Sequence, residues 1–181
     1  PASADLIAEG IIARASGSAQ QTIPTRPISF YLPETLPPGL PPCLRAAGEG
    51  ILDFPALVER FPGVPDAAAR LEELGWEQGA YRQFSCDDPP PDTVGWIDMS
   101  VHHFRDAASA ADAIAFFADA RARATGLQPA PAVDIGDRTA ALGGPVANGL
   151  DYTLYLSTGP LLFRVSGVAP PARGKATTGT S

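Results

Sequence analysis

The clearest pattern along the chain is the alternation of side chains between residues 96 and 104. Successive side chains of a β-strand point to opposite faces of a sheet, so alternate residues share a face. One face would carry Ile97, Met99, Val101 and His103, and the other Trp96, Asp98, Ser100, His102 and Phe104. Because both faces include large apolar groups, the pattern predicts a strand in the interior of a sheet.

Shorter patterns predict further strands, some of them joined by tight turns. They cover residues 28–32, 76–84, 132–142 with a turn at 136–138, 151–157 and 161–168. Asn148-Gly149 and Thr158-Gly159-Pro160 are typical hairpin connections. The last third of the chain is therefore expected to form an antiparallel meander.

Helical spacing of apolar residues and capping residues predict three helices after residue 50. The first begins at the N-cap Asp53 and stops at Pro62-Gly63, and the second runs from Asp66 to Gly75. The longest begins at Asp106 and ends at Gly126. Its buried stripe is expected to consist of Ile114, Phe117, Ala118 and Arg121.

The order of these elements predicts an α+β fold. We expect a twisted antiparallel sheet with two or three helices packed on one face or at its ends. A single domain would cover residues 28–168. Residues 1–20 are expected to form a short helix at 5–15 and a polar linker, as at the end of a preceding domain, and residues 169–181 are expected to be a disordered tail.

The two cysteines, Cys43 and Cys86, border proline-rich and aspartate-rich stretches at the ends of predicted elements. A disulfide between them would close a loop of about 44 residues and stabilise the fold by roughly 3 to 4 kcal/mol. It would also indicate an oxidising, extracytoplasmic compartment. The alternatives are two buried thiols that act as small hydrophobic groups, or thiolates that bind a metal.

The net charge of the chain bears on whether it binds nucleic acid. The formal net charge is −7, and Lys175 is the only lysine, so the sequence has no basic stripe for a phosphate backbone. We therefore expect no nucleic acid as partner. No apolar run approaches the ~20 residues of a membrane span, and no signal peptide is visible, so a leader or anchor is expected to lie outside this sequence.

His102 and His103 are the only histidines, and a strand would direct them to opposite faces, where they cannot chelate one metal. The catalytic alternative is His102 as a general base beside Asp98 or Ser100. Alternate strand residues lie about 7 Å apart, which is long for a direct hydrogen bond and argues against a triad. Structural histidines are the favoured interpretation, and no metal, cofactor or catalytic residue is predicted.

Other candidate sites are weak. The sequence has no glycine-rich phosphate loop and no nucleophile elbow, and the acidic stretch with Asp87, Asp88 and Asp92 reads as a solvated loop rather than a Ca²⁺ site. Four aromatic side chains lie near the Cys86 turn and could line a ligand groove: Trp76, Tyr81, Phe84 and Trp96. Core packing explains them equally well.

Three stretches carry a resemblance to known proteins: Trp96–Phe104 with the alanine-rich helix after it, Ile135-Gly136-Asp137-Arg138, and Leu162–Gly167. Over residues 76–168 the chain resembles secreted bacterial α+β domains, namely uncharacterised lipoproteins and the extracytoplasmic sensor modules of bacterial Ser/Thr kinases. Some of these are similar to the Mog1/PsbP architecture. The resemblance implies an extracytoplasmic location and transfers no catalytic residue.

The sequence therefore predicts a noncatalytic extracytoplasmic binding or sensor-type domain, with an unidentified small molecule or protein as its partner. One alternative is a hydrolase that uses His102 or His103. The other is a structural or assembly module. A deep, partly polar pocket would favour ligand binding, whereas a flat apolar patch would favour assembly.

Overall fold

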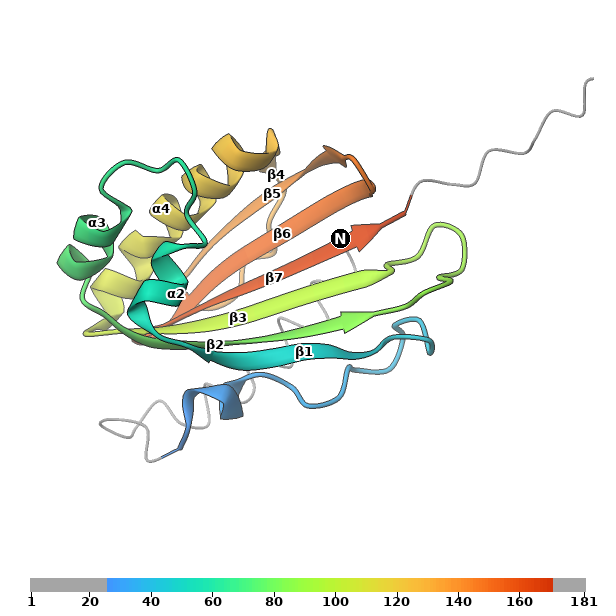
Figure 1. The fold of residues 1–181 in the computed structure, drawn as a ribbon, viewed down its shortest axis with the longest axis horizontal. Helices are drawn as coiled ribbons and strands as arrows, with labels where there is room; N and C mark the ends of the chain where they lie inside the picture. Colours follow the sequence, from blue (N-terminus) through green and yellow to red (C-terminus); the bar gives the residue numbers. More distant parts are fainter. Residues whose placement is uncertain (1–25, 171–181) are drawn as a thin grey trace, which may run out of the picture.

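The computed structural model describes residues 26–170, which form a seven-stranded sheet and three α-helices (Figure 1). The predicted helix at 5–15 and most of the predicted tail lie outside the described residues. All strand pairs are antiparallel, in the order β1-β2-β3-β7-β6-β5-β4. The α+β class with an antiparallel sheet is confirmed.

The strands predicted at 76–84, 96–104, 151–157 and 161–168 are present, with small changes of boundary. The seven strands are β1 Arg45–Leu52, β2 Trp76–Ser85, β3 Trp96–Phe104, β4 Gln128–Ala130, β5 Arg138–Val146, β6 Gly149–Thr158 and β7 Leu161–Ala169, of which β1 and β4 were not predicted. Both predicted hairpins connect neighbouring strands, β5 to β6 and β6 to β7. As predicted, β3 is an interior strand between β2 and β7.

The three helices are α2 (Phe54–Val58), α3 (Ala67–Glu73) and α4 (Ala107–Thr125). The carboxylates of Asp53 and Asp106 accept hydrogen bonds from the backbone N–H of Ala56 and Ser109, at 2.9 and 2.7 Å. These bonds fix where α2 and α4 begin. α4 ends at Gly126, whose φ of 77° lies in the left-handed region that glycine tolerates.

The two faces of the sheet carry separate hydrophobic cores. On one face α4 packs against β5, β6 and β7, and α3 against β2, so the helices gather over one end of the sheet (Figure 1). Phe104 and Phe117 belong to this core. The opposite face buries Met99 and Val101 completely beneath the segment between residues 28 and 44. The alternation predicted along residues 96–104 is thus confirmed.

Three predictions of local structure were wrong. Residues 28–32 form a short 3₁₀-helix, η1 (Ile28–Tyr31), because its flanking prolines, Pro27 and Pro33, lack N–H groups for a sheet. Strand β1 was missed, since its Ala-Ala-Gly-Glu-Gly sequence has low strand propensity and it lies at the edge of the sheet. Within 132–142, the strand begins only at Arg138.

The predicted disulfide is present: Cys43 is bonded to Cys86, with 5.3 Å between their Cα atoms. It joins the segment before β1 to the end of β2, beside the core that η1 covers. Among the described residues, no helix is long and apolar enough to cross a membrane.

Candidate functional site

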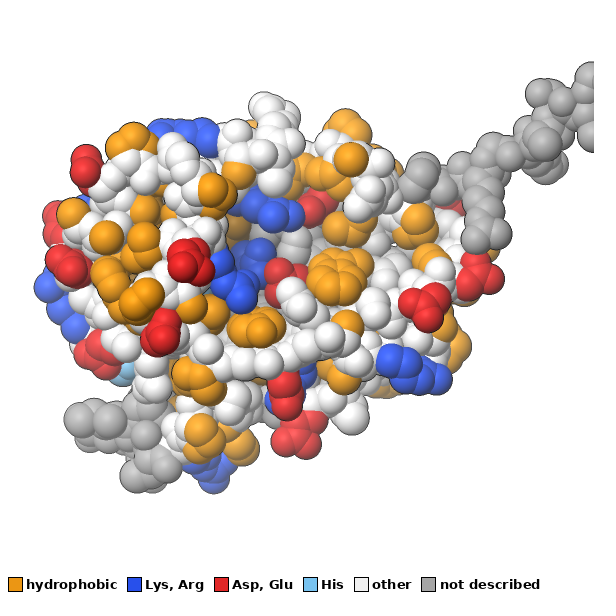
Figure 2. Space-filling model, viewed as in Figure 1, with side chains coloured by type: hydrophobic (Ala, Val, Ile, Leu, Met, Phe, Trp, Pro, Cys, Tyr) orange, Lys and Arg blue, Asp and Glu red, His pale blue; other side chains and the backbone are white. Residues whose placement is uncertain are grey.

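A cavity of about 420 Å³ lies between the sheet and the helices, and Figure 2 shows the hollow with basic and acidic side chains at its centre. We call it the arginine cavity. Its lining comprises Leu52, Leu57, Glu59, Arg60, Phe61, Pro62, Val64, Asp98, Ser100, His102, Phe117, Ala120, Arg121, Ala124, Tyr155 and Arg164. The volume falls within the range of small-molecule sites.

The cavity forms where the helices begin to cover the sheet. Along the helix-facing side of β3, burial increases from Trp96, which is 37% exposed, to Ser100 at 2% and Phe104 at 0%. Asp98 lies between these limits, so its carboxylate is mostly removed from water yet still reaches the cavity. A polar group in this position needs a partner.

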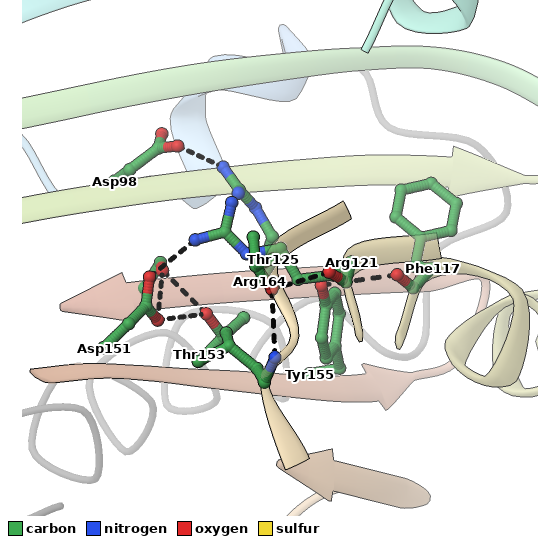
Figure 3. Close-up of polar contacts among 10 residues, drawn as sticks. Asp98, Phe117, Arg121, Thr125, Asp151, Thr153, Tyr155 and Arg164 are labelled. Carbon is green, nitrogen blue, oxygen red and sulfur yellow. Dashed lines mark hydrogen bonds and ion pairs between the residues drawn. The ribbon is translucent and has the colours of Figure 1, made fainter. Parts of the chain in front are cut away.

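Two ion pairs form the polar floor of the cavity, and Figure 3 shows both guanidinium groups directed into the space between the two aspartates. Arg164 on β7 donates to Asp98, and Arg121 on α4 donates to Asp151 at 2.6 Å. Burial opposes the charge of Arg164, but the surrounding groups, among which Asp98 contributes most, together outweigh it and raise the pKa of this guanidinium above its ordinary value. Arg164 therefore remains charged.

Hydrogen bonds from neighbouring side chains fix the carboxylate of Asp151. Its Oδ1 accepts hydrogen bonds from the hydroxyls of Thr153 and Ser166 at 2.8 and 3.3 Å, while Oδ2 receives Arg121. This carboxylate is thus satisfied without a ligand. Its role is to orient Arg121 toward the cavity.

Two buried polar atoms of the floor have no partner among residues 26–170: Oδ1 of Asp98 and Nε of Arg121. An unmade hydrogen bond at a buried group costs about 1–3 kcal/mol, and more when the group is charged. Both residues line the cavity, so a polar group bound beside them can supply the missing bonds.

His102 is a neutral structural group. The indole N–H of Trp76 donates to its Nδ1 at 3.3 Å, so the ring proton is on Nε2, which donates to the Oγ of Ser100 at 3.0 Å. Burial, followed by the charges of Arg164 and Arg60, lowers the pKa of His102 to about 3. An imidazole with this pKa and this tautomer does not take a proton from Ser100 at neutral pH.

The expected separation of His102 and Ser100 was wrong, because their side chains lean together on the pleated strand and make a direct bond. The conclusion that no triad forms still agrees with the geometry, since the carboxylate of Asp98 is bonded to Arg164. His103 lies on the other face, with its Nδ1 2.8 Å from Oε2 of Glu77. No three His, Cys, Asp or Glu side chains within residues 26–170 are grouped to hold a metal.

The structure does not bring the four predicted groove aromatics together. Phe84 belongs to the core on the opposite face, and Trp96 lines a separate shallow hollow beside Cys86. Trp76 and Tyr81 contact the arginine cavity only through other residues: Trp76 through His102, and Tyr81 through Arg60, whose guanidinium carbon lies 4.6 Å from the Tyr81 ring centre. The bulge near the start of β2, between Trp76 and Gln78, interrupts the regular alternation of side chains along this strand.

Sequence reasoning missed the arginines of the cavity. A signal was present, because Arg121 lies on the apolar stripe of the longest helix and Arg164 interrupts an apolar strand. A charge on a face that should be buried requires a partner or a function. Which acids would meet these arginines depended on strand order, which the sequence did not reveal.

No family model and no curated protein matches this sequence. Among solved structures, the chain is similar to the extracellular domain of PknH from Mycobacterium tuberculosis. The identity is 12%, the alignment covers 70% of this chain and 75% of that one, and the TM-score is 0.44. Similarity at this level does not carry function from one protein to the other, and the Mog1/PsbP architecture stays a prediction.

Proposed function

We propose that this chain is a noncatalytic extracytoplasmic domain, of binding or sensor type, that takes a small ligand into the arginine cavity. The observation that carries this proposal is the pair of orphaned charged atoms, Asp98 Oδ1 and Arg121 Nε, at the floor of a cavity of about 420 Å³. A ligand that bonds to them relieves a desolvation cost that the free protein bears. The disulfide supports the extracytoplasmic location.

Two features weigh against the alternatives. A hydrolase would need a base that accepts the Ser100 proton, but His102 donates to Ser100 and carries a strongly lowered pKa. Assembly would favour a flat apolar surface, whereas the prominent feature of the helix face is a hollow with a polar floor. The cavity meets the criterion for ligand binding.

Blocking the mouth of the cavity tests this function. Ala124 and Val64 line the cavity without being buried, so Ala124→Trp and Val64→Trp would place a large ring at its entrance. With the neutral fluorophore N-phenyl-1-naphthylamine as probe, we expect saturable binding to the parent and at least ~10-fold weaker binding to both variants. The measurement is a fluorescence titration.

A matched control is available on the same helix. Ala115 is exposed but does not line the cavity, so Ala115→Trp should bind the fluorophore as the parent does. If the parent shows no saturable binding, or if neither mouth variant weakens it, the proposed function is wrong.

A further inference from the structure

We propose that the ligand is an amphiphilic anion, with an acidic head group on Arg121 and Arg164 and an apolar tail at the opposite end of the cavity. This inference rests on the proposed function and names the chemistry of the ligand. It follows from the hydrogen-bonding groups that the cavity leaves unused, and from the division of its lining into a polar and an apolar end.

The unused groups are mostly donors. A guanidinium has five N–H groups. Within residues 26–170, Arg164 uses Nε for Ser100 and Nη2 for Asp98, whereas Arg121 uses only Nη2, for Asp151. The Oγ of Ser100 already accepts from His102 and Arg164, so its own hydrogen is free for another acceptor. A ligand that fits this floor must be rich in acceptors.

Negatively charged acceptors fit best. Carboxylates and phosphates make short, charge-assisted and often bidentate bonds with guanidinium groups. A third arginine, Arg60, lines the entrance, where its exposed side chain lies over the Tyr81 ring. Thus three of the 13 basic residues of an acidic chain line one cavity, against two carboxylates, Glu59 and Asp98, while His102 adds no charge at neutral pH.

The other end of the cavity is apolar. Leu52, Leu57, Phe61 and Phe117 line it, and each is at most 9% exposed. Phe61 and Phe117 meet edge to face with 5.0 Å between ring centres, which gives this wall a fixed shape. An alkyl or aromatic tail gains hydrophobic free energy here, at about 25 cal/mol for each Å² removed from water.

Asp98 adds a requirement on the chemistry of the ligand's head group. Its free Oδ1 repels an anion and needs a donor. The acidic oxygens should therefore lie beside Arg121, with a hydroxyl or a protonated oxygen beside Asp98. A phosphate monoester that keeps one proton and a hydroxylated carboxylic acid share this chemistry.

The test compares amphiphiles of one chain length as competitors of the neutral fluorophore: decyl phosphate, 3-hydroxydecanoate and decyltrimethylammonium. We expect the two anions to displace the fluorophore at concentrations at least ~10-fold lower than the cation. The phosphate and carboxylate arms then show which head group the cavity prefers.

A pair of neighbouring arginines on α4 provides the variants. Arg121→Gln removes the orphaned Nε–H and should weaken the binding of both anions at least ~10-fold more than it weakens the binding of the neutral fluorophore. Arg123→Gln changes the net charge by the same amount, but at an exposed position that does not line the cavity. This variant should bind the anions and the fluorophore as the parent does.

The outcomes separate the two proposals. If the fluorophore binds in the cavity but anions and cation compete equally, or if Arg121→Gln has no effect on the anions, the charge assignment is wrong and the ligand-binding function stands. If neither the fluorophore nor any amphiphile binds, both proposals fail.

Discussion

Removing the Cys43–Cys86 disulfide is expected to lower the free energy of unfolding by about 4 kcal/mol. The bond joins residues 43 positions apart, and such a loop restricts the unfolded chain strongly. It also anchors the segment that covers one core, because Leu44 and Cys86 are buried beside Ile97. The double variant Cys43→Ala/Cys86→Ala should therefore unfold at markedly lower urea concentration.

Urea denaturation followed by tryptophan fluorescence measures this effect. Parent protein treated with dithiothreitol should show a similar loss, which separates loss of the bond from loss of the two side chains. A change below about 1 kcal/mol in both samples would show that the segment before β1 is held by packing alone. Thiol labelling of the unreduced, denatured protein should find no free thiol.

Replacing His102 with Gln is expected to remove much of the acid sensitivity of the protein. The pKa of His102 is lowered to about 3 in the folded state, whereas an unfolded histidine titrates near 6.5. Between these values the unfolded chain binds a proton that the folded protein does not. Stability is thus fully present above pH 6.5 and falls as the pH drops toward 3.

At pH 4 this linkage costs the parent about 3 kcal/mol relative to pH 7.5. His102→Gln should lose about that much less over the same range, because glutamine can keep an acceptor toward Trp76 and a donor toward Ser100 without titrating. Equal pH dependence in the parent and in His102→Gln would contradict a neutral, buried His102.

Much of the fold could be predicted because local patterns agreed with the final packing. The alternation from Trp96 to Phe104 sets the two faces of β3. The caps Asp53 and Asp106 fix where α2 and α4 begin, and Gly126 ends α4, whereas α2 ends at Val58, before the predicted stop at Pro62-Gly63. Where local signals were weak, prediction was wrong. β1 is an edge strand that pairs with β2 alone. This pairing stabilises a segment whose residues have low strand propensity.

The candidate site could be predicted only in part, since it is assembled from distant segments. Asp98, Ser100 and His102 were identified on one face of a strand, but Asp98 and Ser100 are bonded to Arg164 of β7. The second ion pair joins Arg121 of α4 to Asp151 of β6. Arg164 meets Asp98 only because β7 returns to pair with β3 rather than with a strand nearer in sequence. Strand order, not residue pattern, creates the arginine cavity.

The most direct test of the account is an NMR titration of ¹⁵N-labelled protein with decyl phosphate. We expect saturable shifts of the Arg121 Nε–H signal and of the backbone amides of Ala120, Arg121 and Ala124, since these residues line the arginine cavity. Arg123→Gln should show the same shifts. The absence of shifts, or shifts confined to the hollow around Trp96, would contradict ligand binding in the arginine cavity.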